Sequence, residues 1–130
     1  MIVLDASAAV PYLIGTRAAS AVEEAIGSGP VHVPVHFDVE VYGAVRRELM
    51  LGHIDLMDAL NAMYALRLLI VQRHPVTRHL MDALALRDNI GAHDVFYVLL
   101  ARRLGATFVT CDGPLSRAAA PYCQVSLIAA

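Results

Sequence analysis

Short apolar runs alternate with longer segments of helical periodicity along the whole chain. The runs with strand character cover residues 1–5, 31–35, 69–72, 106–111 and 124–128. The predicted helices between them begin near residue 6 and then cover residues 16–26, 37–51, 56–68, 77–87, 91–104 and 114–120. Because the strands are almost continuously apolar and alternate with helices, the pattern predicts an α/β fold whose parallel sheet is covered on both faces.

Two local signals mark helix boundaries in the middle of the chain. Gly52 follows a segment in which apolar side chains recur at Phe37, Val41 and Val45, so we expect it to end that helix. Asp55 stands directly before the next helix and is predicted to cap its first turn. The apolar stripe of this next helix consists of Leu56, Leu60, Met63 and Leu66. Such a stripe is typical of a helix that faces the core, and an exposed stripe would instead bind a partner helix.

The length predicts a single domain over residues 1–130, since the chain has no repeat, linker or low-complexity segment. Although 58% of the residues are hydrophobic, the longest stretches without Asp, Glu, Lys or Arg, residues 25–37 and 118–130, have only thirteen residues. A membrane-spanning helix needs about twenty, so none is expected. The first residues carry no basic region, and Asp5 interrupts their apolar run. We therefore expect a cytoplasmic protein without a signal peptide.

The charge balance limits the class of nucleic-acid partner. The chain has ten Arg, no Lys, eight Asp and four Glu, for a formal net charge of −2 at pH 7. Strong binding to duplex DNA needs many phosphate contacts and hence a clear basic excess, which this chain lacks. Any nucleic acid must therefore be held by a few arginines, and the candidates are Arg46, Arg47, Arg78 and Arg87.

The two cysteines are expected to be free thiols. Cys111 ends the fourth predicted strand, whereas Cys123 precedes the fifth. If these parallel strands are neighbours, the two thiols lie at opposite edges of the sheet, roughly 10 Å or more apart, which is too far for a disulfide. This placement agrees with a reducing compartment.

Four acidic side chains stand where a parallel sheet collects its ligands. Asp5 ends the first predicted strand, Asp112 follows the fourth, and Glu40 and Asp94 lie near the starts of helices. Ligands of doubly wound sheets bind outside the carboxyl ends of the strands. Each acid taken singly could be a helix cap or could compensate a helix dipole. Four acids at corresponding positions favour a common site.

A site of this kind requires a cation. Two carboxylates about 4 Å apart repel each other by about 4 kcal/mol at an effective dielectric constant of about 20. Oxygen ligands without Cys or His indicate Mg²⁺ or Mn²⁺, and Mg²⁺ held by few carboxylates keeps water ligands and binds substrate phosphate. The chemistry that follows is metal-assisted hydrolysis of a phosphodiester.

Four segments of the chain carry a resemblance to a known family. They are Ile2-Val3-Leu4-Asp5-Ala6-Ser7-Ala8, Pro34-Val35-His36-Phe37-Asp38-Val39-Glu40-Val41, His93-Asp94-Val95-Phe96-Tyr97-Val98-Leu99-Leu100-Ala101 and Val109-Thr110-Cys111-Asp112. In their order and spacing they resemble the PIN-domain ribonucleases, specifically the VapC-like toxins of bacterial type II toxin–antitoxin pairs. The resemblance covers nearly the whole chain.

The resemblance implies a fold, a site and partners. The fold is a three-layer α/β/α sandwich with a five-stranded parallel sheet in the order 3-2-1-4-5. Asp5, Glu40, Asp94 and Asp112 match the acidic quartet that holds Mg²⁺ or Mn²⁺ and cleaves RNA. A cognate VapB-like antitoxin would silence the enzyme, and homodimers are usual in the family. The residues expected near the metal or the substrate are Ser7, Thr110, Arg46 and Arg78.

Three other polar residues are expected to have structural roles. Pro34 interrupts the helix that a zinc pair of His32 and His36 would need, so both histidines are predicted to be structural. Asp38 is expected to cap a helix.

The same residues argue against two other classes of enzyme. A receiver-like phosphoacceptor domain requires a Lys, which is absent, and a dehalogenase-type hydrolase requires an acid where Ser7 stands. The alternative that stays open is a catalytically weak or inactive PIN-like module that binds RNA or an antitoxin.

Overall fold

The computed structural model describes residues 1–129 and alternates strands with helices as the sequence predicts. Its five strands are β1 (Ile2–Leu4), β2 (Val31–Pro34), β3 (Gln72–His74), β4 (Thr107–Thr110) and β5 (Gln124–Leu127). Its α-helices are α1 (Ala6–Ile14), α2 (Ala19–Ile26), α3 (Phe37–Met50), α4 (Leu56–Leu68), α5 (Leu80–Ala85), α6 (Asp94–Leu104) and α7 (Gly113–Ala119). A short 3₁₀ helix, η1 (Thr77–His79), leads into α5.

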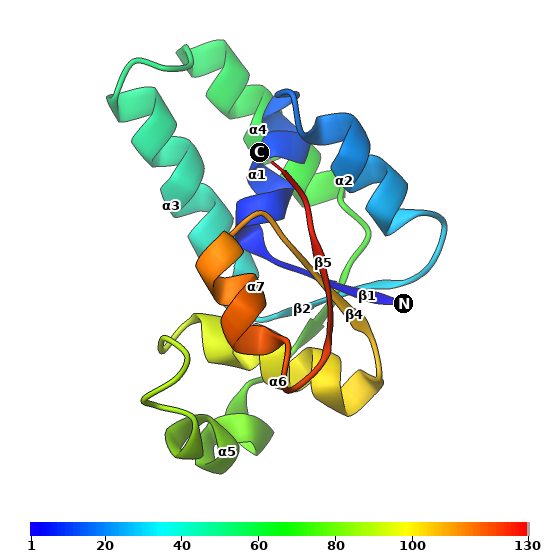
Figure 1. Ribbon diagram of the computed structural model, residues 1–130. Helices are drawn as coiled ribbons and strands as arrows, with labels where there is room; N and C mark the ends of the chain where they lie inside the picture. Colours follow the sequence, from blue (N-terminus) through cyan, green and yellow to red (C-terminus); the bar gives the residue numbers. More distant parts are fainter. Residues whose placement is uncertain (130) are drawn as a thin grey trace.

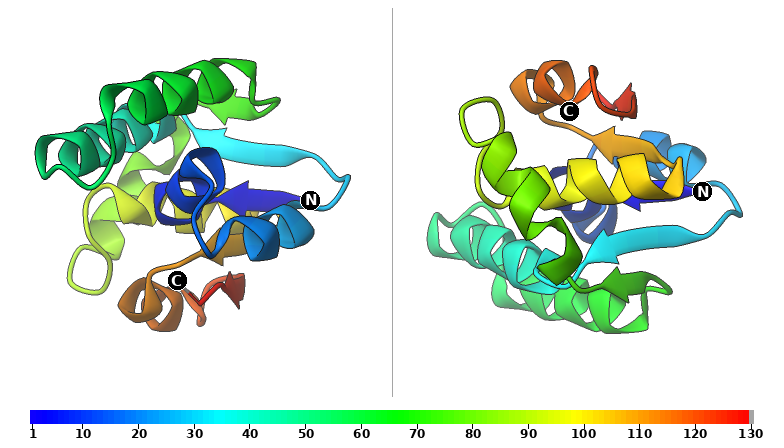
Figure 2. Two further views of the ribbon diagram at one scale, coloured as in Figure 1. Left: turned by 90° about the horizontal axis from the view of Figure 1, so that it is seen from above. Right: turned by 90° about the horizontal axis from the view of Figure 1, so that it is seen from below.

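All neighbouring strands run parallel, and their order is β3-β2-β1-β4-β5 (Figure 1). The two views of Figure 2 show α1 and α2 on one face of this sheet and α6 on the opposite face. Helices α3 and α4 form a hairpin that packs against α1. The predicted fold class, sheet order and two-sided covering are therefore confirmed.

The central strand β1 lies in the core of the protein. Val3 and Leu4 are fully buried between the two helical layers, and the neighbouring strands contribute Val33 and Phe108, which are also fully buried. A central parallel strand is covered on both faces, so its side chains are apolar without alternation. Tyr97 of α6 packs its buried ring near Phe108, with ring centroids 6.1 Å apart. The apolar run thus anchors the segment that ends in Asp5.

The third strand is the main correction to the sequence analysis. The apolar run at residues 69–72 predicts a strand there, whereas β3 covers Gln72–His74. Ile70 is 92% exposed, and pairing with β2 begins only at Gln72, which lies opposite His32. Because β3 lies at the edge of the sheet, its own residues need not be apolar. The apolar run instead lines a surface pocket that lies before the strand.

Helix boundaries agree in outline and differ in detail. The helix predicted for residues 16–26 begins at Ala19, and the one predicted for residues 77–87 is the 3₁₀ helix η1 followed by the short α5. The helix predicted from residue 91 begins at Asp94. Asp55 caps α4 as predicted, in a reciprocal arrangement with Asp58, and Gly52 adopts a φ of +76° just after α3 ends.

Asp38 has a different role from the predicted cap. Both of its carboxylate oxygens accept hydrogen bonds from Arg73 of β3, at 2.6 Å from Nε and 2.9 Å from Nη2. The prediction that Asp38 caps a helix was therefore wrong, because a bidentate arginine contact was available from the edge strand. The ion pair ties β3 to the first turn of α3.

The structure also bears on the predicted thiols and membrane segments. Cys111 and Cys123 are both free, so the predicted absence of a disulfide between them is confirmed, and the strands β4 and β5 beside them are neighbours as the prediction assumes. Within residues 1–129, no helix has the length and apolar character needed to cross a bilayer.

Candidate metal centre

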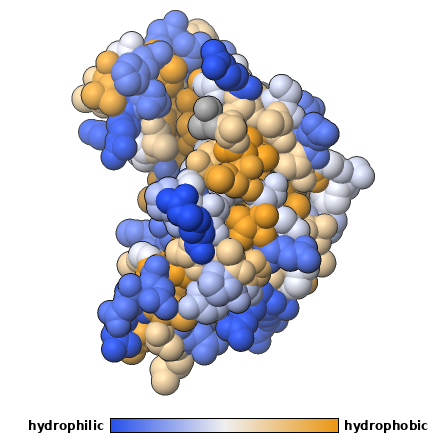
Figure 3. All heavy atoms as spheres, viewed as in Figure 1, coloured by the Kyte–Doolittle hydropathy of each residue, from blue (hydrophilic) through white to orange (hydrophobic). Residues whose placement is uncertain are grey.

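The ends of three strands and the starts of four helices bring the four predicted carboxylates to one pocket. Asp5 lies between β1 and α1, and Asp112 directly precedes α7. Glu40 lies in the first turn of α3, and Asp94 opens α6. All four line a pocket of about 390 Å³. Figure 3 shows the surface hollowed between the α3–α4 hairpin and α7, where this pocket opens.

Asp5 is the most enclosed of the four carboxylates, with 4% of its surface exposed. Its Oδ2 accepts hydrogen bonds from the hydroxyls of Ser7, at 2.6 Å, and Thr110, at 2.8 Å. Ser7 Oγ in turn accepts a hydrogen bond from the backbone N–H of Cys111. Both side-chain hydrogen bonds end on Oδ2, so the orientation of the carboxylate is fixed while Oδ1 stays available to a ligand.

Glu40 is held by a side chain of α6, the helix on the face of the sheet opposite α1 and α2. The hydroxyl of Tyr97 donates a hydrogen bond to Oε1 of Glu40 at 2.7 Å. Burial and the adjacent Glu40 carboxylate raise the pKa of Tyr97, so the phenol remains protonated and able to donate. His36 Nε2 lies 3.6 Å from the same oxygen and donates to the backbone carbonyl of His93. The predicted structural histidine His36 thus borders the site.

Asp112 and Asp94 are positioned by helix starts. Oδ1 of Asp112 accepts a hydrogen bond from the backbone N–H of Leu115, so Asp112 caps α7 while it lines the pocket. The N–H of Asp112 donates to Thr110 Oγ1, which links it to the residue that holds Asp5. Asp94 lies at the amino terminus of α6, where the helix dipole favours a negative charge.

Two of the four carboxylates have raised pKa values in the pocket. The pKa of Asp94 is raised from 3.8 to about 6, first by burial and then by the charges of Asp5, Glu40 and Asp112. The pKa of Asp5 is raised by burial, against the hydrogen bonds from Ser7 and Thr110. The pocket lining contains no Arg or Lys. A divalent cation would supply the missing charge.

The donor set fits a hydrated cation better than a fully enclosed one. Within residues 1–129, no three His, Cys, Asp or Glu side chains converge closely enough to cage an ion by themselves. The carboxylates instead surround an open pocket. Mg²⁺ usually keeps several waters and uses only one or two carboxylates directly, so an open pocket with four carboxylates on its wall suits it. The assignment of the four acids as metal ligands stays a prediction.

The other predicted site residues divide into two groups. Ser7 and Thr110 contact Asp5, as expected of residues close to the carboxylates. Arg46 and Arg78 do not line the pocket, and Arg78 borders a different cavity together with His79. A contact between these two arginines and substrate stays a prediction.

Sequence reasoning missed one contact to the carboxylates. Tyr97 is three residues after Asp94 on α6, and residues with this spacing share a helix face. That spacing was a usable signal for a side chain directed toward the site. It could not show that the hydroxyl reaches Glu40, which comes from a different helix 57 residues away.

Comparison with known proteins agrees with the fold. A family model described as the PIN domain matches residues 2–121. The chain belongs to the PIN-domain family. Proteins of this family are generally nucleases that depend on a divalent metal, which agrees with the uncompensated carboxylate pocket.

Several VapC ribonucleases align with nearly the full length of this chain. Ribonuclease VapC12 of Mycobacterium tuberculosis is 39% identical over 133 aligned positions, which include 99% of this chain and all of the relative. VapC ribonuclease Mb0985 of Mycobacterium bovis is 32% identical, with 98% of each chain covered. Ribonuclease VapC3 of M. tuberculosis is 36% identical over 90% of this chain and 86% of its own length. The chain is thus similar to VapC ribonucleases from end to end.

Proposed function

We propose that this protein is an endoribonuclease and the toxin of a type II toxin–antitoxin pair. It hydrolyses phosphodiester bonds of RNA with a divalent cation, Mg²⁺ or Mn²⁺, held by Asp5, Glu40, Asp94 and Asp112. The observation that carries the proposal is the single pocket lined by these four carboxylates without a basic side chain. The full-length similarity to proteins named VapC ribonucleases supports it.

The residues of the chain orient the carboxylates toward a common ligand. Ser7 and Thr110 fix Asp5 through Oδ2, and Tyr97 fixes Glu40 through Oε1. When bound, the divalent cation supplies Lewis-acid chemistry, in which the pKa of a water falls and the charge of the scissile phosphate is screened. The hydroxyl of Ser7 donates to Asp5 and accepts from Cys111, so it serves to position the carboxylate. The reaction therefore needs no nucleophile from the protein.

Cleavage of RNA by the purified, partner-free protein tests this function. We expect labelled structured RNAs to be cut in Mg²⁺ or Mn²⁺ and to stay intact in EDTA. Asp5→Asn keeps the size of the side chain and its neutral hydrogen-bonding partners, so it should fold and yet lose cleavage by about 100-fold or more. Asp88→Asn, at an exposed acid outside the pocket, is the matched control.

The competing function is a PIN-fold module that binds RNA or an antitoxin without cutting. Such a module would gain stability by losing the mutual repulsion of the four acids. Equal metal-dependent cleavage by the wild-type protein and the Asp5→Asn variant would contradict the assigned site. RNA binding without any cleavage by the wild-type protein would favour the module.

The proposal includes a VapB-like antitoxin as the silencing partner. The apolar stripe predicted on α4 divides in the structure, because Leu66 is buried whereas Leu56 and Leu60 are more than half exposed. The exposed pair continues with Tyr64 and Leu68 at intervals of four residues, which places one apolar face of α4 in solvent. An apolar helix face of this kind fits an amphipathic partner segment.

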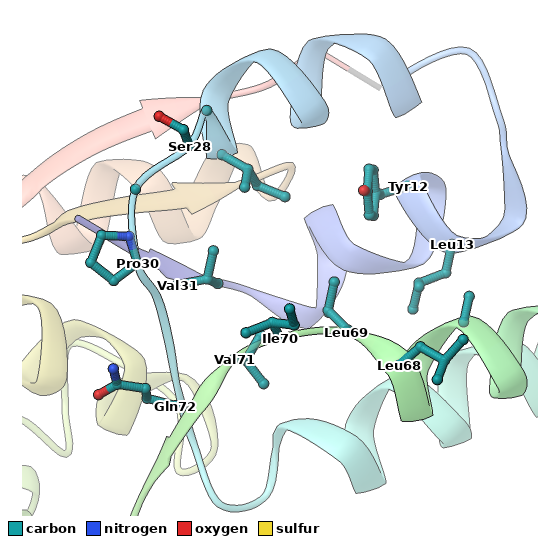
Figure 4. Close-up of a pocket in the computed structure, with 14 residues that line it drawn as sticks. Tyr12, Leu13, Ser28, Pro30, Val31, Leu68, Leu69, Ile70, Val71 and Gln72 are labelled. Atoms are coloured by element: carbon teal, nitrogen blue, oxygen red, sulfur yellow. The ribbon is translucent and has the colours of Figure 1, made fainter.

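A neighbouring pocket extends this apolar surface. Figure 4 shows Tyr12 and Leu13 of α1 facing Leu68, Leu69 and Ile70 at the end of α4, around a cavity of about 680 Å³. The pocket lies beside the residues that precede β2 and β3, at the opposite end of the strands from the carboxylates. This position supports a partner contact that is separate from the catalytic pocket.

Two measurements test the partners. Leu60→Glu should weaken capture of a co-expressed antitoxin and leave cleavage of RNA by the isolated protein unchanged, because Leu60 lies outside the carboxylate pocket. Capture equal to that of the wild-type protein would remove α4 from the contact. We also propose that the protein forms a homodimer. Analytical ultracentrifugation of the isolated protein at two concentrations measures its mass in solution and tests this.

A further inference from the structure

The carboxylate pocket continues into a second cavity, of about 360 Å³, between α1 and α3. The two cavities share three wall residues, Val10, Pro11 and Ala44. We call the second cavity the α1–α3 trough. Its sides are Val10, Pro11 and Ile14 on α1 and Ala44, Arg47 and Glu48 on α3.

We infer that the α1–α3 trough binds the nucleotide next to the scissile phosphodiester in single-stranded RNA, and that Arg47 contacts a phosphate of that nucleotide. The inference rests on the proposed ribonuclease function and names a subsite of its substrate.

The placement of Arg47 follows from helix geometry. Glu40, Ala44 and Arg47 are separated by four and then three residues, so they lie on one face of α3. Arg47 is two turns from Glu40, or about 10 Å along the axis. Arg46 is turned by about 100° from that face and does not line the trough. Among residues 1–129, Arg47 forms no ion pair, so its guanidinium is available to a phosphate.

Charge also favours an arginine at this distance. The four carboxylates repel every phosphate of the substrate whose charge is not screened by a cation, so the flanking nucleotide needs a positive group outside the pocket. Arg47 lines a cavity that shares walls with the carboxylate pocket. The cavity bordered by Arg78, Arg102 and Arg103 shares none.

The rest of the trough suits a base and its ribose. Its apolar sides, Val10, Pro11 and Ile14, are joined by Ile54 from the loop after α3. At the far end, His53 Nδ1 and Glu48 Oε2 lie 2.8 Å apart, and this pair limits the length of the trough. The volume accommodates one unstacked nucleotide and excludes a duplex. Proteins that read RNA by sequence bind unpaired bases in this way.

Binding to RNA in a nuclease-dead background tests the subsite without depending on cleavage. The probe is a fluorescein-labelled, single-stranded RNA oligonucleotide, bound in EDTA to protein that carries Asp5→Asn. Adding Arg47→Ala should weaken binding about tenfold and lower the slope of log Kd against log salt concentration by about 0.7, the value for one phosphate contact on a single strand. Arg67→Ala, at an exposed arginine of α4 outside both cavities, removes the same charge and should leave both quantities unchanged.

A second variant tests the apolar part of the trough. Ala44→Leu keeps a good helix former and fills the space between α1 and α3. It should weaken binding of the same RNA and leave the salt slope as it is, since no phosphate contact is lost. Thermal unfolding of this variant verifies that the fold is intact.

Cleavage kinetics in the wild-type background distinguish the subsite from the catalytic pocket. Arg47→Ala should raise KM and change kcat less than threefold, and the effect should vanish for a substrate trimmed of the nucleotides on the side that occupies the trough.

Three results would overturn the inference. The first is RNA binding by Arg47→Ala equal to that by Arg67→Ala. The second is the absence of RNA binding by the nuclease-dead parent. The third is unchanged RNA binding by Arg47→Ala together with weaker inhibition by the antitoxin, which would assign the trough to the protein partner. A wild-type protein that binds RNA through Arg47 without cleaving it would contradict only the proposed nuclease activity.

Discussion

Tyr97 on α6 donates a hydrogen bond of 2.7 Å to Glu40 on α3, and the two residues are 57 positions apart in the sequence. The ring of Tyr97 is fully buried, so the bond connects the packed helix α6 directly to a carboxylate of the candidate metal centre. The orientation of Glu40 therefore depends on the packing of α6 against the sheet.

Replacing Tyr97 by Phe should separate positioning from folding. The ring keeps its apolar contacts, whereas Glu40 loses its hydrogen-bond donor. Mutation of a residue that orients a metal ligand typically lowers metal affinity by 10–100-fold. We therefore expect the Mg²⁺ concentration that gives half-maximal cleavage to rise about tenfold. Tyr64→Phe, at an exposed tyrosine of α4, is the control. An unchanged Mg²⁺ dependence would show that Tyr97 has only a packing role.

The pKa of Asp94 predicts how the stability of the metal-free protein varies with pH. This pKa is raised from 3.8 to about 6 by folding, so between these values the folded chain binds more protons than the unfolded chain. The free energy of unfolding in EDTA should therefore fall as the pH rises from about 4 to about 6. Asp94→Asn removes the penalty, and it should stabilise the protein at pH 7.5 by about 1 kcal/mol, a value reduced for solvent screening.

Urea unfolding in EDTA at pH 4.0 and pH 7.5 measures this effect. The stabilising effect of Asp94→Asn should disappear at the lower pH, where the wild-type carboxyl is itself protonated. A gain of the same size at both pH values would rule out the charge of Asp94 as its cause.

Divalent cations should stabilise the folded protein through the carboxylate pocket. A ligand that binds only the folded state at 100 times its Kd adds about 2.7 kcal/mol to the free energy of unfolding. We expect a Mg²⁺- or Mn²⁺-dependent increase of this kind, measured by urea unfolding at constant ionic strength. The Asp5→Asn variant should show little of it. Equal stabilisation of both proteins would place the cation elsewhere.

The ion pair between Asp38 and Arg73 should couple β3 to α3 weakly. Both side chains are more than one-third exposed, and exposed pairs contribute about 0.2–1 kcal/mol even with good geometry. A double-mutant cycle with Asp38→Ala and Arg73→Ala measures the coupling directly. A coupling free energy of zero would show that this contact does not stabilise the attachment of β3 to α3.

The candidate acids could be found from the sequence because each carries a local signal. Asp5 and Asp112 follow apolar runs, and Glu40 and Asp94 lie at helix starts, so the rule that parallel strands end at one edge is sufficient to bring them together. The sheet order was predicted by the family resemblance and not by local signals, and it is confirmed. The order of strands along the chain predicted free cysteines, which is also confirmed.

Features that depend on tertiary contacts could not be found in this way. The segment at residues 69–72 is as apolar as a buried strand, and only pairing with β2 shows that the strand begins at Gln72. The contact of Asp38 with Arg73 is decided by an edge strand whose position was itself misjudged. The α1–α3 trough is formed by two helices separated by α2 and β2, so its walls share no sequence pattern.

The position of β4 beside β1 has a consequence for synthesis of the protein. Thr110, which holds the carboxylate of Asp5, is made more than a hundred residues after it. A nascent chain that has not yet released residues 107–112 from the ribosome lacks both this hydroxyl and Asp112. Translation must therefore pass residue 112 before the carboxylate pocket can be assembled.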